Sequence, residues 1–275
     1  MPRNTLKPLV VGNWKMNGAV MARDNVRSMV SMLASMTPEC DIMICPPATL
    51  IAPLCDVLAR TGIAVGGQDC HTKSSGAHTG DVSAPLLRAA GAVAVILGHS
   101  ERRLGHGEDN AMIRAKVAAA HNAGLTAILC LGETLHEYEA GRTEDVVAHQ
   151  LAASLPDGAD CANTVIAYEP VWAIGGGRIP EPRAIGAVHQ SLRAALSNRF
   201  SARQAERMRI LYGGSVTAKN AGEILSLPQV NGVLVGSASL RAGDFVDIIK
   251  ASRKLKGIRA KGGLQPGAIR AKASS

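Results

Sequence analysis

Eight short apolar segments alternate with longer segments of helical character along the whole chain. The apolar segments are rich in Val, Ile and Leu, and several carry apolar residues at consecutive positions. That pattern is typical of parallel strands that are buried on both faces, because helices then cover the sheet on either side. We predict strands at residues 9–14, 41–45, 63–68, 92–97, 125–131, 164–168, 208–212 and 232–235.

The segments between these strands have the spacing and the alanine content of helices. Pro182 stands near the start of one of them, where its missing N–H costs little. Gly62, Gly91 and Gly124 each follow a helical segment and precede a strand, as residues that end helices do. We predict helices at residues 21–36, 48–60, 110–123, 144–154, 182–199, 218–225 and 245–255.

Eight alternating units favour an α/β fold of one domain, a closed (β/α)8 barrel of parallel strands that needs about 250 residues. The main alternative is an open, doubly wound sheet, which often carries a glycine-rich phosphate loop after its first strand. Here the first strand runs into Asn13, Trp14 and Lys15 instead. We therefore predict a barrel over residues 1–256, followed by a basic extension at residues 257–275.

The net charge of +8 is concentrated at the C-terminus. Residues 250–275 contain eight lysines and arginines and no acidic residue, which leaves residues 1–249 formally neutral. A basic terminus of this kind is usually solvated and only occasionally binds RNA or a membrane. We expect no nucleic-acid partner for the barrel.

The six cysteines show neither a C-x-x-C pair nor the spacing of a disulfide framework. They are typical of buried thiols in a reducing compartment. The first residues lack the pattern of a signal peptide, and no segment approaches the roughly 18 apolar residues of a membrane span. We expect a soluble, cytoplasmic protein.

Asn13 and Lys15 follow the first predicted strand, at the edge where a barrel carries its active site. A lysine at a strand end is more often solvated than functional. Trp14 and Met16 on either side nevertheless favour a position in a cleft. The ammonium group would there neutralise a phosphate or polarise a carbonyl.

His99 follows the fourth strand, at the start of the segment Gly98 to Arg103. Ser100 can cap a short helix there, although Arg103 occupies the position where a capping box needs an acid. The positive end of that helix would disfavour the protonated form of His99. A lone histidine is more often structural, but this position predicts a neutral hydrogen-bond donor.

Glu169 follows the sixth strand, and Pro170 biases it towards an extended backbone. Next to Pro170, Val171 and Trp172 the carboxylate would be partly desolvated, which makes it a stronger base. The apolar and glycine-rich segment at 173–177 is better explained as a lid over a substrate than as a plain surface loop.

Glycines follow the last two strands, a pair after the first of them and one after the second. Gly213 and Gly214 precede Ser215, and Gly236 precedes Ser237. In such barrels the loops after these two strands frequently form a phosphate site, and glycines let backbone N–H groups approach an anion. Either loop alone is weak evidence, but two of them, each expected to open a helix, predict a phosphate site.

These segments resemble the triosephosphate isomerase family over residues 8–252. The resemblance implies interconversion of dihydroxyacetone phosphate and D-glyceraldehyde 3-phosphate in glycolysis and gluconeogenesis, through an enediolate and without metal or organic cofactor. The substrate that the resemblance implies is therefore a small phosphorylated triose. The matching motifs stand at residues 13–17, 98–102, 130–134, 168–175, 212–216 and 234–240.

The resemblance also implies a role for each site residue. Glu169 is the base, and His99 donates to the developing enediolate oxygen. Asn13 and Lys15 stabilise the charge of that oxygen. The remaining roles are phosphate binding by backbone groups at Gly175, Ser215, Gly236 and Ser237, closure of the lid by Tyr212 and Ser215, and support of Lys15 and the base by Glu101.

The segment from Gly76 to Gly80 resembles the loop through which the family forms homodimers, with His78 and Thr79 as its contact residues. The lid and the phosphate loop depart from the family pattern. Gly176 and Pro180 are expected to alter the kinetics of the lid, and Ser237 is tolerated if its φ is negative. Two alternatives remain open, a relative acting on a four-carbon ketose phosphate and a catalytically silent scaffold that acts through its tail.

Overall fold

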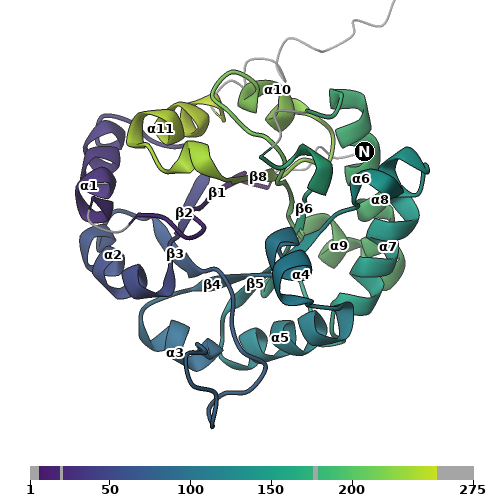
Figure 1. Ribbon diagram of the computed structural model, residues 1–275. Coiled ribbons are helices and arrows are strands. Elements are labelled where there is room, and N and C mark those ends of the chain that lie inside the picture. The colour runs from purple at the N-terminus through teal and green to yellow at the C-terminus, as the bar shows by residue number, and fades with distance from the viewer. Residues whose placement is uncertain (1–5, 19–20, 176–178, 253–275) are drawn as a thin grey trace, which may run out of the picture.

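A computed structural model describes residues 6–18, 21–175 and 179–252 of the chain. Its strands form one closed barrel in the order of the sequence, and every neighbouring pair is parallel. Helices surround the barrel in a ring (Figure 1). The strands are β1 (Leu9–Asn13), β2 (Asp41–Cys45), β3 (Ala64–Gly67), β4 (Ala94–Leu97), β5 (Thr126–Leu131), β6 (Thr164–Tyr168), β7 (Ile210–Tyr212) and β8 (Gly232–Val235).

The helices lie between these strands and after the last one. The longer ones are α1 (Ala22–Leu33), α2 (Ile51–Leu58), α5 (Asn110–Asn122), α7 (Thr143–Ser154), α8 (Pro182–Arg199) and α11 (Ala242–Ala251). The shorter ones are α3 (Ala84–Ala89), α4 (Ser100–His106), α6 (Leu135–Glu139), α9 (Ala202–Arg207), α10 (Ala221–Ser226) and the 3-10 turns η1 (Ala48–Leu50), η2 (Val171–Ala173) and η3 (Ser237–Ser239).

The alternation of side chains along each strand gives the molecule two apolar cores. On β1, Val11 belongs to the cluster that fills the barrel, together with Ile96 and Leu211. Val10 belongs to the cluster between the barrel and its helices, where Val26 of α1 is also buried. Successive side chains of a strand point to opposite faces, so apolar residues at consecutive positions serve both cores. The pairing of β1 with both β2 and β8 closes the barrel.

The predicted fold is confirmed. Strands β2, β6 and β8 and helix α8 have the predicted bounds, and the other predicted strands are shorter than expected. The prediction for residues 48–60 is wrong in part, because a 3-10 turn precedes α2. The helix expected from residue 245 begins at Ala242, and the helix expected from residue 218 begins at Ala221.

Three short helices, α3, α6 and α9, are not among the ranges predicted from the sequence, although Gly91 was expected to end a helical segment where α3 lies. Each has at most six residues, too few for an apolar period to be recognised. A capping side chain precedes each of them, namely Ser83, Thr134 and Ser201, and accepts a hydrogen bond from the first turn. Thr134 and Glu137 form a complete capping box, so this signal was available in the sequence.

All six cysteines are free thiols. Within the described parts of the chain, no helix combines the length and the apolar character that crossing a membrane requires. The predicted boundary at residue 256 and the basic extension at 257–275 lie outside the described residues.

Candidate active site

A cavity of about 350 Å³ opens at the carboxyl ends of the strands. It brings together residues that the sequence places after β1, β4, β6, β7 and β8. Glu101 and Tyr212, the two residues with supporting roles in the sequence analysis, do not line it. Its lining includes all eight residues predicted to be catalytic or to bind substrate, namely Asn13, Lys15, His99, Glu169, Gly175, Ser215, Gly236 and Ser237.

Lys15 has a left-handed backbone conformation, with φ +52°. The backbone N–H of Lys15 donates to Oδ1 of Asn13 at 3.1 Å. Nε2 of Gln68, a residue that the sequence analysis missed, donates to the carbonyl oxygens of Lys15 and Cys45 at 2.8 Å each. A non-glycine residue is strained in this conformation, so these bonds hold the loop in the shape that aims Lys15 at the cavity.

The ammonium group of Lys15 is paired with a carboxylate at the mouth of the cavity. Nζ of Lys15 lies 2.5 Å from Oε1 of Glu101, in α4. The side chain of Glu101 is 54% exposed, so water screens the pair and it adds little to stability. Lys15 itself lines the cavity, so the pair leaves its side chain beside the site.

His99 is the cap of helix α4, and the prediction that Ser100 caps this helix is wrong. The helix begins at Ser100, and Nδ1 of His99 accepts from the backbone N–H of Glu101 at 3.2 Å. Because Nδ1 accepts a hydrogen bond, the hydrogen of a neutral ring sits on Nε2. Nε2 lies 3.2 Å from Oε1 of Glu169.

Glu169 is buried at the start of the loop after β6, with a carboxylate that faces the cavity. Its Oε2 accepts from the backbone N–H of Ser100 at 3.4 Å. Two glycines leave room for it. A Cβ at Gly132 would lie 1.7 Å from the carbonyl oxygen of Glu169, and a Cβ at Gly213 would lie 2.7 Å from its Cγ. Larger residues at these positions would displace the carboxylate.

The two glycine-rich loops differ from each other. Gly236 leads directly into η3, and Ser237 is not among the non-glycine residues with positive φ, so its side chain is tolerated there. After β7 the expectation is wrong, because helix α10 begins at Ala221, several residues beyond Gly214. The intervening turn is held by Oδ1 of Asn220, which accepts from the N–H of Thr217 at 2.8 Å.

Tyr212 lies beneath the loop after β7. A Cβ at Gly214 would lie 2.2 Å from its hydroxyl oxygen, so only glycine fits there. That hydroxyl is buried and has no hydrogen-bond partner among the described residues. Burial raises the pKa of Tyr212, so the group stays a neutral donor.

The near end of the expected lid is anchored to Glu133, a second residue missed by the sequence analysis. Oε1 of Glu133 accepts from Nε1 of Trp172 at 2.8 Å and from the hydroxyl of Tyr168 at 3.2 Å. Burial raises the pKa of Glu133, and the bond from Trp172 partly opposes that shift. At the far end Pro180 is buried, whereas Gly176 lies outside the described residues, so the lid kinetics stay a prediction.

A network of four charges joins α4 to its neighbours, with Lys116 and Glu108 buried and Asp69 and Arg102 partly exposed. Nζ of Lys116 donates to both carboxylate oxygens of Asp69 at 2.8 Å and to Glu108 at 2.6 Å. Arg102 bonds the same two carboxylates, at 3.0 and 2.5 Å. Burial alone would raise the pKa of Glu108, but Lys116 and Arg102 outweigh it and the pKa is lowered. The network fixes the helix that carries Ser100 and Glu101.

These features define a (β/α)8-barrel enzyme equipped for proton transfer on a small anionic substrate, with a buried carboxylate next to an imidazole N–H. A family model described as triosephosphate isomerase matches residues 8–252. The chain belongs to the triosephosphate isomerase family, and the family predicted from the sequence is confirmed.

Individual relatives agree with this assignment. The chain is 50% identical over 247 residues to a triosephosphate isomerase of Bradyrhizobium diazoefficiens, with 90% of this chain and 98% of the relative covered. It is 54% identical over 247 residues to one of a Ruegeria species, with coverage of 89% and 98%. A solved triosephosphate isomerase structure from Bartonella henselae is 43% identical, with a TM-score of 0.84 over 90% of this chain and 100% of that one.

Proposed function

We propose that the chain interconverts dihydroxyacetone phosphate and D-glyceraldehyde 3-phosphate, the isomerisation of glycolysis and gluconeogenesis, with Glu169 as the base. The observation that carries the proposal is the pairing of Glu169 with Nε2 of His99 inside the cavity of a chain of this family. A proton next to a carbonyl is weakly acidic, so a base and a donor to the developing oxygen must act together.

The reaction begins with a change of partner for Glu169. Its carboxylate rests on His99 and on the N–H of Ser100. When substrate enters, the carboxylate turns to the carbon that carries the proton, and Nε2 of His99 becomes free to donate to the substrate oxygen. Glu169 removes the proton and returns it to the neighbouring carbon, while the hydroxyl proton passes from one substrate oxygen to the other by way of Nε2 of His99. The enediolate exists only between the two carbon transfers.

The other residues stabilise charge and hold the phosphate. The ammonium group of Lys15 and the amide of Asn13 face the developing oxyanion, and this arrangement lowers the barrier because the groups are already in place. Closure of the lid excludes water and protects the enediolate phosphate from elimination. Phosphate binding falls to backbone groups at Gly175, Ser215, Gly236 and Ser237, with Tyr212 and Ser215 holding the closed lid.

Substrate length separates the proposal from its nearest alternative, a four-carbon ketose phosphate. The cavity is small, at about 350 Å³. Steady-state kinetics with D-glyceraldehyde 3-phosphate and with a four-carbon aldose phosphate, in one coupled assay format, decide between them. We expect the higher kcat/KM for the triose. A higher value for the four-carbon substrate would overturn the proposal.

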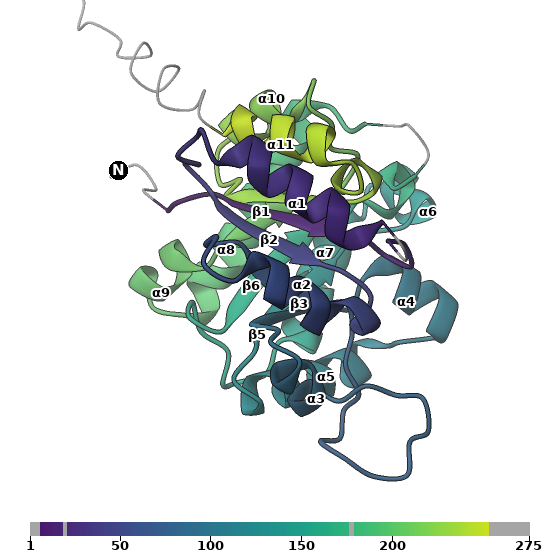
Figure 2. The same cartoon turned by 90° about the vertical axis from the view of Figure 1, so that its left-hand side faces the viewer.

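We also infer a homodimer, formed through the segment from Gly76 to Gly80. This loop projects from the barrel between β3 and α3 (Figure 2). Beside it lies a second cavity of about 580 Å³ that Met16 and Arg102 help to line, and Met16 is 94% exposed. We infer that the loop of one copy enters this cavity of the other. Sedimentation should show a dimer for the wild type and a monomer for Thr79→Arg, and a fully active wild-type monomer would refute it.

A cytoplasmic location agrees with the six free thiols, and we propose it on that ground. The tail has no part in the proposed reaction. Deletion of residues 257–275 should leave kcat/KM unchanged and reveal no salt-sensitive RNA binding. An inactive full-length protein whose salt-sensitive RNA binding disappears with the tail would instead favour the scaffold alternative, in which the tail is the functional part.

A further inference from the structure

We propose that Arg103 is a positioning residue for the proposed isomerisation, and that its guanidinium group sets where His99 stands relative to Glu169. The inference rests on the proposed function, because it concerns the donor and the base of that reaction. Arg103 belongs to α4 and does not line the catalytic cavity. It acts through main-chain groups on which the donor and the base both depend.

The guanidinium group donates to three neutral acceptors. Nε of Arg103 donates to the carbonyl oxygen of Gly98 at 2.8 Å, and Nη2 donates to that of Cys130 at 3.1 Å. Nη1 donates to Oδ1 of Asn110 at 2.8 Å. The guanidinium group is planar and rigid, so this fork of three donors fixes the three acceptors relative to one another. A side chain with a single polar atom could not do the same.

Two of these acceptors lead to the catalytic pair. Gly98 is the residue before His99 in the chain. Cys130 precedes Leu131 in β5, and the carbonyl oxygen of Leu131 accepts from the backbone N–H of Glu169 at 2.7 Å. The fork therefore connects the backbone that carries the donor to the backbone that carries the base.

The chain turns at Gly98, which has a left-handed conformation with φ +68°. A Cβ at this position would lie 3.0 Å from Cδ1 of Ile113 and 3.2 Å from Nη2 of Arg103. The turn is thus packed against the guanidinium group, and the bond from Nε fixes the direction of the peptide that leads into His99. Without that bond the ring of His99 could move away from Glu169.

The fork is itself held in place by Asn110, the first residue of α5. Oδ1 of Asn110 accepts from Nη1 of Arg103 and also from Oγ of Ser154 at 3.0 Å. Ser154 is fully buried in α7. The guanidinium group is therefore anchored to two outer helices, and it can transmit their position to the loop after β4.

Ion pairing does not account for this arginine. Among the described residues, Arg103 takes part in no ion pair, whereas its neighbour Arg102 is paired with both Asp69 and Glu108. Burial lowers the pKa of Arg103 more than the negative charges around it raise that pKa. The contribution of the side chain is therefore its set of directed hydrogen bonds to neutral groups.

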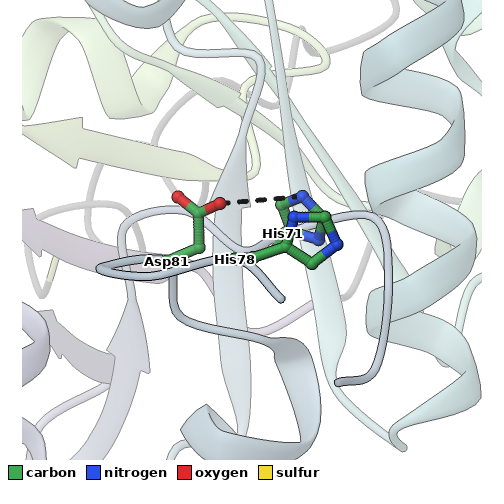
Figure 3. Close-up of side chains that lie close together, drawn as sticks. All are labelled: His71, His78 and Asp81. Carbon is green, nitrogen blue, oxygen red and sulfur yellow. Dashed lines mark ion pairs between the residues drawn. The ribbon is translucent and has the colours of Figure 1, made fainter. Parts of the chain in front are cut away.

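His71 has the same local arrangement as His99 but no such fork. Its Nδ1 accepts from the N–H of Lys73 at 3.0 Å, as Nδ1 of His99 accepts from the residue two places further on. Its Nε2 faces the carboxylate of Asp81 at 3.7 Å (Figure 3). In the described part of the chain, no arginine side chain donates to the carbonyl of Cys70, the residue before His71. The catalytic pair is closer, at 3.2 Å, so His71 is an internal reference for a ring that no fork holds.

Arg103→Lys and Arg103→Met separate the fork from the charge. Lysine keeps the charge on a single ammonium group, whereas methionine removes both the charge and the donors. We expect kcat to fall by about 10²-fold in both variants, because a displacement of about 1 Å in a catalytic group can cost that much. KM should change little, since the three bonds of Arg103 do not involve the phosphate loops after β7 and β8.

Arg199→Met is the matched control. Arg199 of α8 also donates to two main-chain carbonyls, those of Leu155 at 2.7 Å and Pro156 at 3.2 Å, and neither residue lines the catalytic cavity. Its kcat should equal that of the wild type. Far-UV circular dichroism checks that each variant is folded. Asn110→Ala removes one acceptor of the fork but keeps Arg103, and it should lower kcat in the same direction by a smaller factor.

Nuclear magnetic resonance of the histidine rings tests the role of Arg103 independently of the reaction. The Cε1–H signal of His99 should shift in folded Arg103→Lys and Arg103→Met, the signal of His71 should not, and neither should shift in Arg199→Met. An inactive wild type would overturn the proposed function, and the ring signals would still report on the fork. An unshifted His99 signal, a wild-type kcat in folded Arg103→Met, or full kcat in Arg103→Lys overturns the proposal.

Discussion

Nε2 of His99 lies 3.2 Å from Oε1 of Glu169, so the proposed donor and the proposed base are partners of each other before substrate arrives. The other nitrogen of the ring accepts from the N–H of Glu101, which leaves Nε2 as the donor. Substrate has to separate the pair. Once the pair is separated, both the carboxylate and the imidazole N–H are available to the substrate, and the start of α4 already orients each of them.

His99→Asn tests the donor without removing the helix cap. Asparagine is a good cap, so α4 should persist, but its amide cannot reach the place of Nε2. We expect kcat to fall by about 10²–10³ with little change in KM, as for loss of a donor to a developing oxyanion. Steady-state kinetics measure this, and a kcat within a factor of a few of the wild type would exclude His99 as the donor.

Gly213→Ala tests how closely the position of the base is set. Its Cβ would lie 2.7 Å from Cγ of Glu169, so the carboxylate must move. We expect kcat to fall by about 10²-fold, because a shift of about 1 Å in a catalytic group can cost that much. Gly222→Ala is the matched control. Its Cβ meets nothing within 4 Å, and activity should not change. Equal activities would show that the base tolerates the shift.

Lys116→Met tests the network of four charges. It leaves Asp69 and Glu108 with Arg102 as their remaining cation, and removal of one partner from a buried ion pair costs about 3–5 kcal/mol. Lys250→Met removes a pair whose side chains are about half exposed, and the expected cost is below about 1 kcal/mol. Denaturant unfolding at one fixed protein concentration compares them. Similar losses of unfolding free energy in the two variants would show that the network stabilises the fold no more than an exposed ion pair does.

We expect the buried ring of His189 to account for part of the stability that the protein loses in acid. Burial lowers the pKa of His189 from 6.5 to about 4. Between these values the unfolded chain binds a proton that the folded chain does not, so stability falls as the pH drops from 6.5 towards 4. The loss from this group is at most about 3 kcal/mol.

His189→Phe keeps a buried ring and removes this titration. The ring lies next to those of Tyr168 and Tyr212, and its Nδ1 is 3.3 Å from the carbonyl of Gln229. Loss of that hydrogen bond should cost about 1 kcal/mol at pH 7. The fall in unfolding free energy between pH 7 and pH 4.5 should then be smaller than in the wild type. Parallel curves for the two proteins would contradict this assignment.

Most of the fold could be predicted from the pattern of apolar segments, because strands that are buried on both faces occur in few kinds of fold. The end of each strand in turn locates Asn13, His99 and Glu169, which share one cavity although they are far apart in the sequence. What the sequence could not predict depends on contacts between elements. Gln68 acts on a carbonyl two strands away, and Glu133 supports Trp172 from the preceding strand end. Neither contact produces a periodic pattern of residues by which the sequence could reveal it.

The cap of α4 shows the same limit on a smaller scale. Ser100 has the residue type that usually caps a helix, and the sequence therefore favoured it. His99 takes the role because its ring is held by Glu169 on the other side, a contact that only the closed barrel creates. The functional position thus overrides the local preference.

A coupled assay of the wild type and Glu169→Ala with D-glyceraldehyde 3-phosphate tests the central claim most directly. The wild type should isomerise the substrate. The variant retains the cavity and the phosphate loops, and its kcat should be lower by a factor of about 10²–10⁴, the contribution of a positioned base. An inactive wild type, or a variant that keeps the wild-type kcat, would contradict the assignment of Glu169 as the base of a triose phosphate isomerisation.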